Sequence, residues 1–145
     1  MNVVPILAFA VFLGAQVAPV FAEQGAPVGR WLGEGDLLPD AANKFGQSNH
    51  QVHVLELKPD NTYSWQKAED AGKFAPLPNQ KGTWTWQQTG TNQGILTQVC
   101  KVEIYSVGVQ EWVEEFKIVW TGPNRFNRTP TMKGFEKEVF VFKRQ

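Results

Sequence analysis

The feature that most constrains this chain is the short, regular spacing of turn signals between stretches that alternate apolar and polar side chains. The clearest case is residues 50–67, where "HQVHVLEL" and "TYSWQK" flank the turn "KPDN". Proline fixes φ in such a turn and Asp-Asn suits the positions after it, so the two stretches predict a hairpin. Alternation with period two is typical of strands, and the chain after residue 22 shows almost no helical period.

Further turn signals divide the rest of the chain in the same way. The longest gaps are residues 37–49, which could hold a short helix or a lid loop, and the loop at 68–80. Strands joined mostly by short hairpins prefer a meander, and a meander of this length closes into a barrel, which removes exposed edges. The expected fold class is therefore all-β, a single antiparallel up-and-down barrel. Its eight strands are expected at residues 29–35, 50–57, 62–67, 81–88, 95–107, 110–121, 125–129 and 136–144.

Residues 1–22 differ from the rest because they contain no charged side chain and end in "VFA", with small residues where a signal peptidase reads. This pattern predicts a cleaved secretory signal and an exported protein, periplasmic or secreted. A retained membrane anchor is the alternative, since the stretch is marginally long enough to span. Its two prolines and its glycine favour cleavage, after which no stable membrane anchor remains. Residues 23–145 then form one domain, large enough for a modest core.

Composition argues against several function classes. Lys plus Arg equals Asp plus Glu, and no basic stripe is visible, so we expect no nucleic-acid partner. Cys100 is the only cysteine, which predicts a buried, inert thiol and no disulfide within the chain. Alternation puts His50 and His53 on opposite faces of a strand, so we expect no metal site. Without a nucleophile elbow or a phosphate-binding loop, the sequence predicts no enzyme and no cofactor.

Side-chain parity predicts which residues face the barrel interior. In "EWVEEFKIVW" the face that carries Trp112 also carries Ile118 and is mostly apolar. In the last strand Phe140 and Phe142 oppose two valines, so both faces are apolar and parity is ambiguous there. The side chains predicted to line a ligand site are Tyr63, Trp65, Trp84, Trp86, Trp112, Glu114, Phe116 and Trp120.

Glu114 is the most informative of these residues because a carboxylate on an apolar face needs a partner or a raised pKa. One interpretation makes it a polar anchor in a ligand pocket. The other places a β-bulge at Glu114 and Glu115, which turns both side chains outward. We favour the bulge.

Four stretches of the chain resemble the lipocalin-like proteins of the calycin group, in particular the small exported bacterial ones. "GRW" matches the Gly-x-Trp that opens the first lipocalin strand, and "LELKPDNTYSW" is similar to the turn between the next two strands. "GTWTWQ" resembles a Gly-x-Trp strand that recurs in bacterial members, and "WTGPNRF" followed by "VFVFKR" resembles their closing strands. The chain departs from the typical member because it lacks paired cysteines and ends on a strand instead of a helix.

The resemblance implies a structural role for the first motif. In the family, the tryptophan plugs the closed end of the barrel and a basic residue near the end of the last strand packs across it. Trp31 would fill the first role and Arg144 the second, with Lys143 as the alternative. A guanidinium on an indole face is a favourable cation–π contact, and Gly29 would allow a close backbone approach. An ordinary core role for Trp31 is the alternative.

Two functions remain open from the sequence. The leading one is a barrel that binds a small apolar or amphipathic molecule among the predicted lining residues, mainly by apolar burial. The alternative is a protein-interaction or inhibitor module with a filled core, which would contact a protein partner through loops 37–49 and 68–80.

Overall fold

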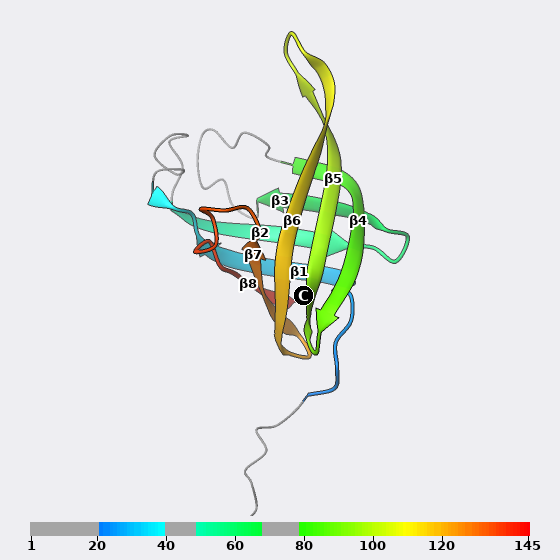
Figure 1. Cartoon of the computed structure of the whole chain (residues 1–145), viewed down its shortest axis with the longest axis vertical. Coiled ribbons are helices and arrows are strands. Elements are labelled where there is room, and N and C mark those ends of the chain that lie inside the picture. The colour runs from blue at the N-terminus through cyan, green and yellow to red at the C-terminus, as the bar shows by residue number, and fades with distance from the viewer. Residues whose placement is uncertain (1–20, 40–48, 68–78) are drawn as a thin grey trace, which may run out of the picture.

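A computed structural model describes residues 21–39, 49–67 and 79–145 of the chain. The strands form one closed antiparallel barrel in which each strand pairs with its neighbours in sequence, and the first pairs with the last (Figure 1). This confirms the predicted fold class. The eight strands are β1 (Gly29–Asp36), β2 (His50–Leu57), β3 (Thr62–Lys67), β4 (Asn79–Gly90), β5 (Gln93–Ile104), β6 (Gly108–Gly122), β7 (Arg125–Pro130) and β8 (Phe140–Arg144).

The short hairpins form where the sequence supplies residues that tolerate a left-handed backbone. Asn61 and Asn92 have φ of 65° and 57° in the β2–β3 and β4–β5 connections, a conformation in which asparagine is far more common than most residues. The β5–β6 reversal uses Ser106 at φ 70° and Gly108 at φ 89°. These local choices explain why the predicted bounds of β2 and β3 match the structure to the residue.

Three sequence predictions about strands were wrong. The strand expected at residues 95–107 ends at Ile104, because residues 105–107 form the turn, with Ser106 at positive φ. No bulge occurs at Glu114, because β5 and β6 keep one continuous register from Gln93 to Ile104; the irregularities lie at Gln88–Gly90 and Trp120–Gly122 instead. The last strand begins at Phe140 and not at residue 136. Residues 131–139 form turns, and these place the buried Glu138 so that its carboxylate accepts a hydrogen bond from the Leu38 amide at 3.0 Å.

One end of the barrel is closed around Trp31, which is fully buried. Its ring packs edge-on against Phe126 and Trp120, with centroid distances of 4.8 and 5.5 Å. The guanidinium carbon of Arg144 lies 4.3 Å from the ring centroid, which confirms the predicted cation–π contact. A Cβ on Gly29 would lie 2.5 Å from the Arg144 guanidinium, and φ there is +132°, so this glycine permits the close approach as expected.

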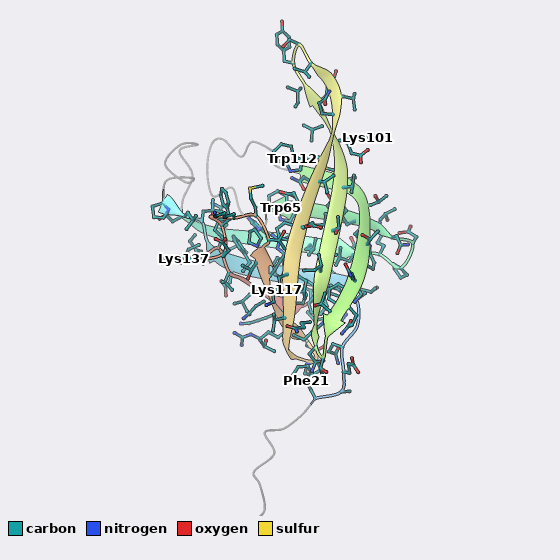
Figure 2. All side chains as sticks on the ribbon, viewed as in Figure 1. Phe21, Trp65, Lys101, Trp112, Lys117 and Lys137 are labelled. Carbon is teal, nitrogen blue, oxygen red and sulfur yellow. The ribbon has the colours of Figure 1, made fainter. Side chains whose placement is uncertain are left out.

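Residues 21–28 run across the same end of the barrel and complete its closure. The Trp31 and Trp120 indole N–H groups donate to the carbonyls of Pro27 and Gly25, at 2.8 and 3.0 Å. Phe21 also packs against the core at this end (Figure 2). The signal predicted for residues 1–22 lies almost wholly outside the described residues, and no described helix is long and apolar enough to cross a membrane.

Candidate functional site

The eight predicted lining residues do not form one group. Tyr63, Trp84, Phe116 and Trp120 are buried, and Trp65, Trp86 and Glu114 are half-buried. Three of the indoles have structural partners: Trp120 belongs to the closed end, Trp84 donates to the Lys58 carbonyl at 3.1 Å, and Trp86 donates to the Gln88 side chain at 2.9 Å. Trp112 is 45% exposed on β6 (Figure 2), opposite Cys100, where β5 still pairs with β4 but β6 no longer pairs with β7.

Beyond the apolar closed end, the barrel interior is polar as well as aromatic. The residues that supply this character share a face with core residues on their own strands, and sequence analysis did not select Gln51, Gln98 or Arg128 among them. Arg128 follows buried Phe126 by two positions on β7, and Gln98 lies between Leu96 and Cys100 on β5. Parity applied to polar as well as apolar residues would have placed them inside. The buried members of this interior set are Gln51, His53, Gln98, Cys100 and Arg128.

Arg128 is the most unusual residue of the interior because its charge is buried and forms no ion pair with any residue that the structure describes. Its side chain is only 6% exposed. Within the described residues, no hydrogen bond or ion pair links its guanidinium to another group. Burial lowers the pKa of Arg128 to about 10, although Glu114 and Tyr63 oppose that shift. The guanidinium therefore stays protonated at neutral pH and places a positive charge in the interior.

Aromatic rings hold this guanidinium in place. Its central carbon lies 4.1 Å from the ring centroid of Phe116, 4.8 Å from that of Phe142 and 5.9 Å from that of Phe140. Ring faces attract cations, most strongly in desolvated sites, so the three phenyl groups supply part of the stabilisation that water would give. Ring faces do not use the N–H donors of Arg128, and no acceptor among residues 21–39, 49–67 and 79–145 binds them, so they suit a planar acceptor such as a carboxylate.

Glu114 and Tyr63 set the electrostatics around Arg128. Glu114 lies within electrostatic range of both residues but forms no ion pair within 4 Å among the described residues. Burial raises the pKa of the Tyr63 hydroxyl, so this group is a neutral hydrogen-bond donor at physiological pH. It donates to the Gln80 side chain at 3.4 Å, which is a long contact.

Gln98 adds an unused donor to the same interior. It is 2% exposed, and its side-chain nitrogen has no hydrogen-bond partner within the described part of the chain. Gln98 stands opposite Glu114 in the β5–β6 register, so both side chains belong to the inward face. A buried donor left without a partner costs about 1–3 kcal/mol, and a bound polar group would recover that cost.

His53 contacts two aromatic side chains of the barrel interior, Phe140 and Trp65. Its ring stacks on Phe140, with centroids 4.8 Å apart and planes 11° apart, and it meets the edge of Trp65 at 4.6 Å. His53 is 5% exposed, which is more buried than the half-buried position expected from sequence. Cys100 is buried as predicted, at 4% exposure.

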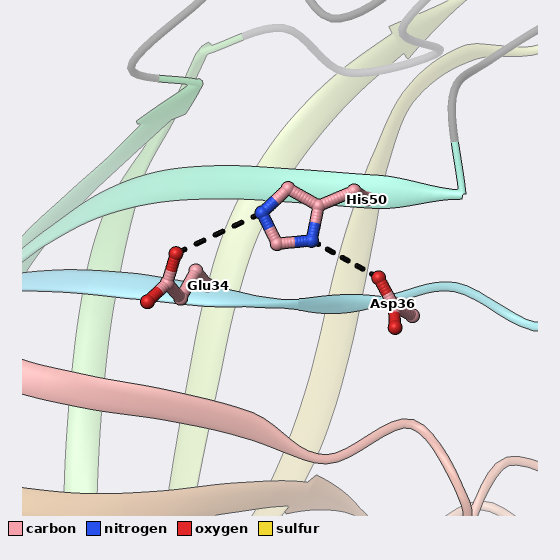
Figure 3. A network of polar contacts seen from close by, with 3 residues as sticks. All are labelled: Glu34, Asp36 and His50. Carbon is pink, nitrogen blue, oxygen red and sulfur yellow. Dashed lines mark hydrogen bonds and ion pairs between the residues drawn. The ribbon is translucent and has the colours of Figure 1, made fainter.

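His50 points away from the barrel, so the two histidines lie on opposite faces as predicted. It lies between Glu34 and Asp36 on the outer surface of β1, with ring nitrogens 3.7 and 3.0 Å from their carboxylates (Figure 3). All three side chains are more than half exposed, so these contacts contribute little to stability. Among the described residues, no group of three His, Cys, Asp or Glu side chains could hold a metal ion.

Comparison with models of known protein families, with curated proteins and with solved structures finds no match for this chain. The eight-stranded up-and-down barrel is nevertheless consistent with a lipocalin-like fold. The functional argument therefore depends on the interior residues themselves.

Proposed function

We propose that this chain is an exported lipocalin-like protein that binds a small amphipathic molecule inside the barrel. The observation that supports this proposal most directly is Arg128, a buried guanidinium that lies on phenyl rings and has no ion pair among the described residues. Buried charges in proteins are normally paired, because desolvation without compensation is costly. An acid group on the ligand would supply the missing partner.

The residues around Arg128 suit the two ends of such a ligand. The Gln98 amide would donate to polar atoms of the acid group, as would the neutral Tyr63 hydroxyl in place of its long contact with Gln80, and the guanidinium would bind the acid through paired N–H donors. The apolar portion would lie against Trp65, Phe116 and Phe140, where each buried Å² contributes roughly 25 cal/mol. Glu114 disfavours a second negative charge on the ligand.

The competing function is an interaction module with a filled barrel, which would use loops 37–49 and 68–80. Most residues of these loops lie outside the described part of the chain. A direct binding test separates the two functions, because only a ligand-binding barrel saturates with a small probe.

The test uses two fluorescent probes with the same aromatic skeleton, anionic 1-anilinonaphthalene-8-sulfonate and neutral N-phenyl-1-naphthylamine. We expect saturable binding of both, with the anion favoured. Arg128→Met should weaken anion binding at least about tenfold and leave the neutral probe nearly unchanged, because it removes a charge-assisted interaction worth roughly 1.5–3 kcal/mol.

Arg125→Met is the matched control, because Arg125 lies on the same strand, is exposed and carries the same charge. It should bind both probes as the unmodified protein does. Absence of saturable binding, or equal loss of anion binding in the two variants, would contradict the proposed site.

A further inference from the structure

The β5–β6 hairpin extends beyond the rest of the barrel as a two-stranded ribbon (Figure 1). β5 and β6 pair as far as Ile104 and Gly108, but the pairing of β5 with β4 stops at Cys100 and that of β6 with β7 stops at Phe116. Within the described part of the chain, residues 101–111 therefore form a ribbon with no third strand beside it, and the outer edge of β6 lacks β7 as far as residue 115. Isolated two-stranded ribbons are marginally stable in water, so an extension of this length calls for a partner.

The ribbon also carries most of the exposed apolar side chains. Six of the nine large hydrophobic residues that are exposed in the described chain lie between positions 104 and 113. Tyr105 at the tip is 98% exposed, and Val107 and Val109 are 60% and 63% exposed. Such clustering on one projecting element marks an interaction surface, whereas scattered exposed residues would need no explanation.

The geometry of the β6 backbone determines which N–H and C=O groups the ribbon exposes along its outer edge. The Trp120 amide donates to Asn92 on the β5 side, and the Glu115 carbonyl accepts from the Thr131 amide on the β7 side. In a strand, the backbone N–H and C=O groups of successive residues point alternately to the two sides. Because β6 is regular from Glu115 to Trp120, its odd-numbered residues direct their N–H and C=O groups toward β7. Beyond Glu115, the backbone groups of Val109, Glu111 and Val113 thus have no paired strand among the described residues, and we refer to them as the free edge.

We propose that this free edge pairs antiparallel with the same edge of a second copy of the chain, across a twofold axis beside Gln110. The free edge runs from the tip at Tyr105 to Glu115, where β7 begins to occupy it, and Gln110 is its midpoint. A register centred there uses the whole edge without displacing β7. In this register, Val109 of each copy lies opposite Glu111 of the other copy. Each of these two residue pairs would exchange two backbone hydrogen bonds, which gives four in total.

The distribution of charged side chains on the ribbon favours the same register, the one centred on Gln110. The ribbon and its base carry one lysine and four glutamates, at Lys101, Glu103, Glu111, Glu114 and Glu115. Centring the pair on Gln110 puts Glu111 opposite Val109 and Val107 opposite Val113, so no glutamate faces another. A shift of the centre to residue 111 would oppose the two copies of Glu111, and like charges directly opposite destabilise a sheet. The acidic character also disfavours an anionic membrane as the occupant.

The first test replaces one edge residue with proline. Glu111→Pro removes an N–H on the proposed pairing edge, while Glu103→Pro removes an N–H on the outer edge of β5, with the same change in charge. Sedimentation velocity of the purified protein over about 1–500 μM should show a monomer–dimer equilibrium in the unmodified chain. We expect Glu111→Pro to raise the dimer Kd about tenfold or more, because the backbone hydrogen bond donated by residue 111 is lost in both copies. Glu103→Pro should leave the dimer Kd nearly unchanged.

The second test uses the twofold axis and needs no change to the backbone. Gln110 faces itself across the proposed axis, so Gln110→Glu alone and Gln110→Lys alone should each weaken the dimer by like-charge repulsion. An equimolar mixture of the two variants should restore it through a mixed dimer of opposite charges. Circular dichroism spectra that match the unmodified protein serve as the folding control.

Three outcomes would overturn the proposal: a monomer at every concentration, equal effects of the two proline variants, or no dimer in the mixture. Flotation of monomeric protein with phosphatidylcholine vesicles, lost in Tyr105→Ser, would assign the tip to a membrane surface instead.

Discussion

The two halves of the barrel interior differ in how completely their polar groups are paired. At the closed end, each indole N–H of Trp31 and Trp120 reaches a backbone carbonyl, and the Arg144 guanidinium also donates to Val28 and Asn124. Farther inside, Arg128 and the Gln98 amide have no such partners among the described residues. A half whose polar groups are satisfied stabilises the fold, whereas a half with unused donors is suited to binding.

Trp31→Ala should have the largest effect and tests the structural half. Removing a fully buried indole leaves a cavity and loses contacts with two aromatic rings, so we expect the free energy of unfolding to fall by roughly 3–5 kcal/mol. Urea unfolding followed by far-ultraviolet circular dichroism measures it. A loss below about 1 kcal/mol would mean that this end is not the stabilising half.

Arg128→Met should have an effect of opposite sign and smaller size. Because burial lowers the pKa of Arg128 to about 10, the unfolded chain binds the proton more tightly, and the charge costs folding free energy at neutral pH. That cost should shrink as pH rises above about 10, where the folded protein loses this proton before the unfolded chain does. We expect Met at this position to leave the free energy of unfolding unchanged or raise it by about 1–3 kcal/mol in urea titrations at pH 7. A marked loss would give Arg128 a structural role.

The coupling between Trp31 and Arg144 should be about 1 kcal/mol. Their contact is one cation–π interaction, and Arg144 also donates at 3.1 Å to the Asn124 side chain, so Arg144→Ala alone should cost on the order of 1 kcal/mol. In a double-mutant cycle on urea stability the two losses should be less than additive. Strict additivity would contradict the contact.

Tyr105→Ser should have the smallest effect on the monomer. The side chain is 98% exposed at the tip of the hairpin, so its removal should change the free energy of unfolding by no more than about 0.5 kcal/mol in dilute protein. Differential scanning calorimetry at low concentration measures the shift. A large loss would show that the tip contacts the barrel.

The sequence alone determined the features that depend on neighbouring residues along the chain. Alternation in "HQVHVLEL" and "TYSWQK" and the turn between them set the β2–β3 hairpin, because strand period and turn chemistry act over a few residues. The Gly-Arg-Trp motif and the basic end of the last strand are also short local patterns, and the resemblance that they carry implied the contact between Trp31 and Arg144 that the structure shows.

Tertiary structure decided the features that depend on comparing distant segments. Glu114 was assigned to a bulge because its own strand offers no inward partner for a carboxylate. The positive charge that interacts with Glu114 belongs to Arg128, which lies on a different strand, β7. The free edge of β6 could not be predicted either, since it exists because the pairing of β7 with β6 stops at Phe116 while β6 still pairs with β5 as far as Gly108. Burial and pairing depend on which strands lie side by side and how far each extends, and closure of the barrel fixes both.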